Sequence, residues 1–156
     1  MTLNGIPIHP LLVHFEVVIV LVTAILAIVT ALWPAARRRI GSFAPACGVV
    51  ALILTPLTTS AGEDLAATTS DPNSILASHM RLGDQMIWWV LPLFVVMTAL
   101  WSMRAIPRLR HHSSTNPALF HSVSVSLTAV SVVLALGALV WLYRIGDSGA
   151  QSVWLQ

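Results

Sequence analysis

The chain has 156 residues, of which 56% are hydrophobic and only 9% are charged, and it contains no lysine. Soluble domains carry roughly a quarter charged residues, so this composition excludes an ordinary soluble protein. The net charge of +2 does not indicate nucleic-acid binding, because the arginines form short tracts beside apolar segments, as membrane topology signals do.

Four apolar segments are long enough to cross a bilayer, since a helical span needs about 20 residues. The first begins with Pro10, which a helix tolerates at its N-terminus, and it ends at Trp33-Pro34. The second contains two prolines, which predict a kink or a shorter helix. We predict an all-α fold, a single four-transmembrane-helix bundle over residues 1–156 with helices at about 10–33, 40–60, 82–103 and 117–143.

The charged residues separate between the two sets of helix ends. All six acidic residues lie at or near one set, and six of the eight arginines lie at the other, in or beside the first and third connections. By the positive-inside rule these two connections are cytoplasmic, and both termini are extracytoplasmic. The N-terminus lacks the basic region and cleavage site of a signal peptide, so we expect the first apolar run to be retained.

Two segments on the acidic side have no predicted helix. The connection from Gly62 to His79 is acidic and, at roughly 16 residues, long for a compact bundle, which is typical of functional or mobile loops. The tail after Tyr143 is too short to fold alone, and Trp154 is expected to anchor it at the membrane interface.

Several stretches resemble a known family. The opening GIPIHPLLVHFE is similar to the G-x-P-x-H-P-x-x-V-H-F signature of the bacterial membrane family catalogued as domain of unknown function 2231, whose members have four helices. Further matches are AGE at 61–63, HMRLGD at 79–84 and RIGDSGA at 144–150. Glu16 stands where the family usually has proline, and Asp147 where histidine is frequent, which leaves a role for the end of the fourth helix in doubt.

The resemblance implies a multi-pass protein of the bacterial cytoplasmic membrane. It also implies electron transfer as the context, because relatives are often joined to or encoded with c-type cytochrome or Rieske-like modules. It supplies no settled activity.

Histidines beside the acidic helix ends are candidate cofactor ligands. His14 lies about one turn inside the first helix, and His79 precedes the third helix on the same side. His9 and His14 are about 140° apart around a helix, so both cannot point at one site unless His9 lies on non-helical backbone. Because a bundle can hold a cofactor between facing helices, we predict haem b bound by His14 and His79 near the extracytoplasmic face. It would pass electrons from a membrane donor to a c-type cytochrome, a Rieske-like protein or a respiratory complex.

The nearby carboxylates support a different site. Ionisable groups within a span cost about 2.5–3.5 kcal/mol on insertion scales, so they usually face the bundle interior. Histidine with Glu and Asp is the ligand set of zinc, iron, manganese or copper. The alternative is a divalent transition-metal site formed from His9, His14, Glu16, Glu63, His79 and Asp84.

The same residues also admit a purely structural role. Glu16 with His14 or Arg81 can form a buried polar network, and Asp84 sits where a carboxylate favours the helix dipole. Small residues on the fourth helix allow close contact within the bundle, in a homo-oligomer or in a larger complex in the lipid bilayer. This alternative is a cofactor-free accessory subunit.

Other functional classes have less support. No phosphate-binding loop, nucleophile elbow or zinc-protease motif is present, so we expect an electron carrier or accessory subunit rather than a stand-alone enzyme. For His111, His112 and His121, on the arginine side, we predict no functional role.

Overall fold

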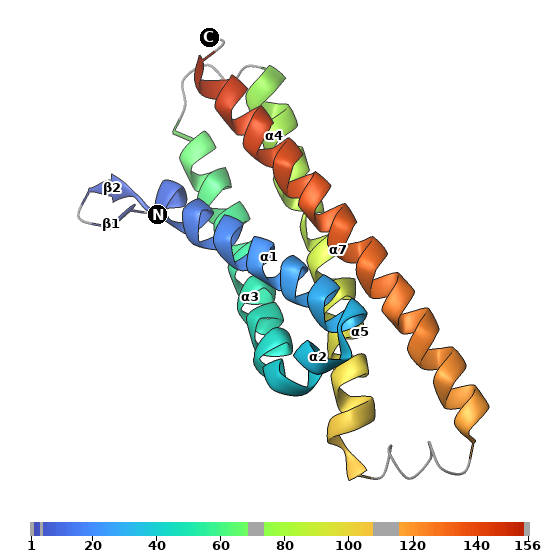
Figure 1. Ribbon diagram of the computed structural model, residues 1–156. Coiled ribbons are helices and arrows are strands. Elements are labelled where there is room, and N and C mark those ends of the chain that lie inside the picture. The colour runs from blue at the N-terminus through green and yellow to red at the C-terminus, as the bar shows by residue number, and fades with distance from the viewer. Residues whose placement is uncertain (1, 4, 69–73, 108–115, 155–156) are drawn as a thin grey trace.

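The computed structural model describes residues 2–3, 5–68, 74–107 and 116–154 (Figure 1), and it confirms the all-α membrane fold. Four segments are long and apolar enough to cross a membrane, and the third of them runs through α4 and α5 together. The described elements are β1 (Thr2–Leu3), β2 (Ile6–Pro7), α1 (His9–Leu32), α2 (Pro34–Ile40), α3 (Phe43–Ala66), α4 (Ser74–Gln85), α5 (Ile87–Ala105) and α7 (Pro117–Trp154).

The long helices form a closed ring. Helix α1 packs against α3 and α7, and α5 packs against the same two helices, while α4 lies mainly along α7 (Figure 1). The strands β1 and β2 pair antiparallel ahead of α1, with Gly5 at φ 81° in the turn between them. The first residues of α1 lie at the same end of the bundle as the last residues of α3 and α7, because all of them line one cavity.

Proline and glycine define the first helix boundaries. Pro10 occupies the first turn of α1, where a missing N–H costs no hydrogen bond. Trp33 is extended at the end of α1 because Pro34 follows it, and Pro34 then opens the short helix α2. Gly41, at φ 54°, ends α2 and turns the chain into α3.

The second, third and fourth helical segments are longer than predicted, whereas α1 has the predicted length. Helix α3 runs on to Ala66 and α4 begins at Ser74, so much of the expected 62–79 connection is helical. Helix α7 continues through the expected tail to Trp154 without a proline to stop it, and its 38 residues span roughly 57 Å. Five residues with sequence-based predictions lie outside the described residues. Asp71, Arg108 and Arg110 belong to the predicted charge separation, and His111 and His112 are predicted to have no functional role.

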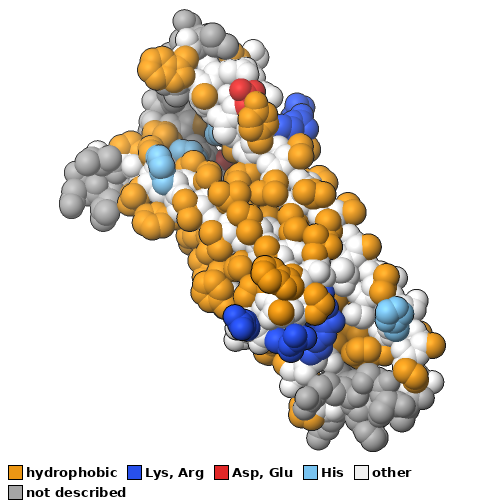
Figure 2. Space-filling model, in the orientation of Figure 1, with side chains coloured by type: hydrophobic (Ala, Val, Ile, Leu, Met, Phe, Trp, Pro, Cys, Tyr) orange, Lys and Arg blue, Asp and Glu red, His pale blue; other side chains and the backbone are white. Residues whose placement is uncertain are grey.

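Small side chains fill the contacts between the helices. Ala24 and Ala27 of α1, Ala51 of α3, and Ala135 and Ala138 of α7 are all fully buried. They allow the helix backbones to approach closely, as in other membrane bundles. Large apolar side chains point outward instead and cover the middle of the molecule (Figure 2), where lipid would surround it.

Two tryptophans fix α4 and α5 against α7. The Trp89 ring packs on Gly137 so closely that a Cβ atom there would lie 2.0 Å from its Cζ3. Trp141 tilts against Trp89 with ring centroids 5.9 Å apart, and its Nε1–H donates to the Leu82 carbonyl at 3.0 Å. In a regular helix the Met86 N–H would donate to the Leu82 carbonyl. At the break between α4 and α5 it donates to the Gly83 carbonyl instead, which leaves the Leu82 carbonyl available to Trp141. The contact sets the position of α4 along α7.

Gly137→Ala should therefore destabilise the protein. The added methyl group overlaps the Trp89 ring, and overpacking of this kind costs about 1–3 kcal/mol. Denaturant titration of the full chain in detergent measures the effect. Gly146→Ala is the matched control, because a Cβ atom at Gly146 meets nothing within 4 Å. Equal stability of the two variants would contradict the packing described.

Candidate cofactor site

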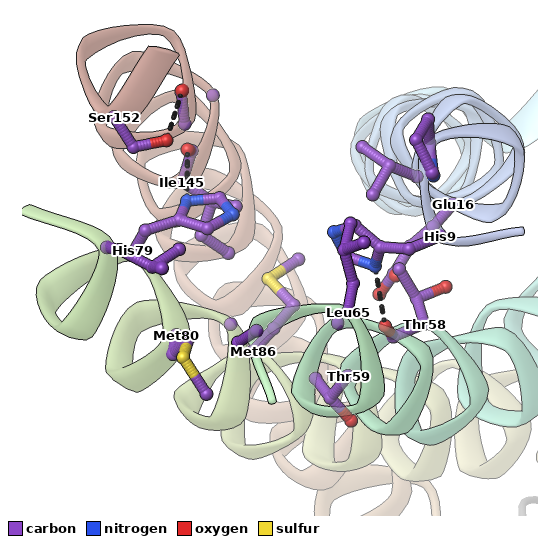
Figure 3. Close-up of a pocket in the computed structure, with 18 of the residues that line it drawn as sticks. His9, Glu16, Thr58, Thr59, Leu65, His79, Met80, Met86, Ile145 and Ser152 are labelled. Carbon is purple, nitrogen blue, oxygen red and sulfur yellow. Dashed lines mark hydrogen bonds between the residues drawn. The ribbon is translucent and has the colours of Figure 1, made fainter. Parts of the chain in front are cut away.

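A cavity of about 1020 Å³ opens at the end of the bundle where α1 begins and α3 and α7 end (Figure 3). Its volume is at the upper end of the roughly 300–1,000 Å³ typical of small-molecule pockets. Apolar side chains form much of the wall, among them Val13, Val17, Leu65 and Met86. All six predicted ligands line this one cavity: His9, His14, Glu16, Glu63, His79 and Asp84.

His9 is the first residue of α1 and reaches across to α3. Its Nδ1 lies 3.0 Å from the Thr58 carbonyl oxygen. A carbonyl only accepts, so Nδ1 carries a proton, and the neutral form of this ring has its lone pair on Nε2. The ring lies against Gly62, where a Cβ atom would be only 2.9 Å from the imidazole Cε1.

His79, on α4, reaches across to α7 in the same way. Its Nδ1 lies 3.1 Å from the Ile145 carbonyl oxygen and 3.0 Å from Ser148 Oγ. The Ser148 hydroxyl itself donates to Ile145 at 3.0 Å. The imidazole lies against Gly149, where a Cβ atom would be 3.0 Å from Cε1.

The two histidines share one arrangement. Each ring donates to a carbonyl at position i of the neighbouring helix and lies on a glycine at i+4. In an α-helix the carbonyl of residue i points toward residue i+4, so a ring bonded to that carbonyl lies over residue i+4. A Cβ atom at either glycine would force the ring to shift. Figure 3 shows the His9 and His79 rings extending into the cavity from opposite walls.

His14 lines the same cavity but is bonded differently. Its side chain is exposed, and its Nδ1 lies 2.5 Å from the carbonyl oxygen of Pro10, on its own helix. Among the described residues, no hydrogen bond from a second helix orients its ring in this way. The predicted ligand pair of His14 and His79 stays a prediction, whereas the second-helix hydrogen bonds favour His9 as the partner of His79.

The carboxylates surround the cavity without gathering around the histidines. Glu16 is only 8% exposed and lies against Thr55 and Thr58 of α3, while Glu63 and Asp84 are exposed. Within residues 5–68, 74–107 and 116–154, no three His, Cys, Asp or Glu side chains are grouped to hold a metal ion. The divalent-metal site therefore stays a prediction without support from this geometry.

Sequence reasoning missed the residues that orient the rings. Thr58 contributes only its carbonyl, as does Ile145, and a backbone group leaves no mark in a sequence. Gly62 and Gly149 could have been noticed, because both fall within the stretches that resemble the family. A glycine within a helix is the only local sign of this arrangement. It indicates a histidine contact only when the fold places a histidine of another helix against it.

Residues 5–156 match the family described as predicted membrane protein (DUF2231). The chain belongs to this family. The match confirms the resemblance and, with the four candidate spans, places the protein in a membrane. It covers both walls of the cavity, since His9, Gly62, His79 and Gly149 all lie within the DUF2231 region. No curated protein and no solved structure matches the chain.

Glu16 is expected to be dispensable for folding. Insertion scales put an ionised side chain in a span at about 2.5–3.5 kcal/mol, and the neutral amide of Glu16→Gln avoids that cost. We expect the free energy of unfolding of Glu16→Gln in detergent to equal or exceed that of the unchanged protein. A loss of more than about 2 kcal/mol would instead place Glu16 in a structural network with Thr55 and Thr58.

Proposed function

We propose that the protein is a membrane b-type cytochrome in which His9 and His79 hold one haem between them. The observation that carries this proposal is the matched arrangement of the two rings around one cavity. In each ring the Nδ1–H is bound to a backbone carbonyl, which leaves Nε2 as the ligand atom. Metal-ligating histidines almost always donate their other N–H to a carbonyl, carboxylate or water in this way.

The cavity also fits a flat, largely apolar group. Its volume of about 1020 Å³ lies between two helix pairs, α1 with α3 and α4 with α7. Leu65, Leu76, Met80 and Met86 line it with apolar surface. Gly62 and Gly149 keep each ring against its helix, so that neither ring fills the space between them.

The residues of the chain would have separate tasks. The carbonyls of Thr58 and Ile145 hold the two imidazoles in one tautomer and make Nε2 a better electron donor. The apolar lining keeps water away and so influences the reduction potential. A bound haem would supply an iron atom that accepts and releases one electron.

The charge distribution indicates the side of the membrane on which the cavity lies. The cavity is at the acidic end, opposite the arginine-rich connections, so the positive-inside rule puts it at the extracytoplasmic face with both termini. We infer a donor in the membrane and an extracytoplasmic acceptor, such as a c-type cytochrome or a Rieske-like protein. The chain would act as a carrier or as a subunit of a respiratory complex.

Absorption spectra of histidine variants test the proposal. The purified full chain should show a Soret band, sharp α bands when reduced, and about one haem per chain. His9→Ala and His79→Ala should each lose this spectrum, because each removes one of the two residues that would hold the haem iron. Free imidazole added to His79→Gly should restore it, which separates ligand loss from misfolding. His121→Ala, on α7 away from the cavity, is the matched control.

Three outcomes would overturn parts of the proposal. Loss of haem in His14→Ala and His79→Ala, with retention in His9→Ala, would establish His14 and His79 as the ligands. A colourless protein with stoichiometric zinc, copper or manganese would favour the carboxylate site. A protein that binds neither haem nor metal would be an accessory subunit without a cofactor.

The glycines beneath the rings give an independent test. Gly62→Ala and Gly149→Ala push a methyl group against imidazole Cε1, so each ring must shift and the haem-to-protein ratio should fall. Gly146→Ala also alters a glycine that lines the cavity, but it meets no atom within 4 Å and should keep the original ratio. Pyridine haemochrome assays measure this ratio. Equal ratios in all three variants would show that the glycines do not position the ligands.

A further inference from the structure

A second cavity lies at the opposite end of the helices. Its volume is about 550 Å³, and it is enclosed by residues of α1, α2, α3 and α5. Its apolar side includes Ala44, Pro45, Met97 and Leu100, and Trp101 also lines it. Three of its lining residues are arginines: Arg37, Arg38 and Arg104. Figure 2 shows arginine side chains gathered at this end.

Arg37 is held in place by the end of α1. Its guanidinium donates to the carbonyl oxygens of Thr30 and Ala31, which lie at the negative end of the helix dipole. Burial, and then the nearby charge of Arg104, lower the pKa of Arg37. An arginine remains charged at neutral pH nevertheless. Two guanidinium groups that repel one another therefore share one cavity.

The described carboxylates do not neutralise this cavity. Glu16, Glu63 and Asp84 line the other cavity, at the far end, with Asp64 adjacent to Glu63 and Asp147 adjacent to Gly146. Arg37 is partly buried while Arg38 and Arg104 are exposed, and at this end the described part of the chain supplies only cations to the cavity. An anion from outside the chain would remove the repulsion.

We propose that this cavity binds the phosphate headgroup of an anionic phospholipid from the leaflet at the arginine end. The cationic rim matches the phosphate, and the apolar side offers a surface to the first part of an acyl chain. Basic pockets between membrane helices bind lipid headgroups in this way. Exposed Trp33, where α1 ends, is close in sequence to the Pro34 and Arg37 of this cavity, and tryptophan is enriched at the headgroup level of membranes. This proposal does not depend on the haem.

Native mass spectrometry of the full chain with defined lipids tests it. Phosphatidylglycerol should remain bound in preference to phosphatidylcholine. Each arginine near a lipid phosphate contributes about 1 kcal/mol, so Arg104→Gln and Arg38→Gln should each weaken phosphatidylglycerol binding about fivefold. Arg39→Gln is the matched control, since it removes the same charge from α2 but Arg39 does not line the cavity.

The possible results separate a built site from general charge attraction. Retention of phosphatidylglycerol by Arg39→Gln, with loss in both cavity variants, supports the proposal. Equal weakening in all three variants, or equal binding of both lipids, overturns it. Displacement by millimolar glycerol phosphate would also overturn it, because the cavity would then hold a soluble anion. Unchanged helicity by circular dichroism confirms that a variant that loses lipid is still folded.

Discussion

A hydrogen bond from an imidazole N–H to a helix carbonyl, made once in each helix pair, determines the layout of the main cavity. His9 ties the start of α1 to the end of α3, and His79 ties α4 to the end of α7. Each bond places a ring against a glycine, where an added Cβ atom would force the ring to shift. The two rings are thereby held at opposite walls, and the space between them stays open.

The rest of the bundle keeps these two helix pairs at a fixed separation. Buried alanines on α1, α3 and α7 allow close backbone contact near the centre, while the larger apolar side chains face outward. Trp89 packs on Gly137, and Trp141 bonds to the Leu82 carbonyl at the break between α4 and α5. Helix α4 packs along α7, so His79 can reach the Ile145 carbonyl.

Much of the fold could be predicted from the sequence, because a bilayer imposes length and polarity directly on each span. The four spans and the gathering of six ionisable residues at one end followed from hydropathy and charge placement. The helix ends did not, since polar residues such as those after Tyr143 can continue a helix beyond the membrane. The sequence did not show that His9, rather than His14, bonds to a second helix. That depends on the register between α1 and α3, which is set by packing. The backbone carbonyls that orient both rings are common to every residue and could not be singled out.

The placement of the main cavity at one end of the helices has an electrical consequence. Moving one charge through the whole membrane potential costs about 2.3 kcal/mol per 100 mV. A charge that enters and leaves at one end crosses little of that potential. A single carrier site at that end, without a second one deeper in the bundle, would let electrons pass along the membrane surface rather than through it. Such a protein would neither consume nor build the transmembrane voltage, and its rate would be insensitive to how energised the membrane is.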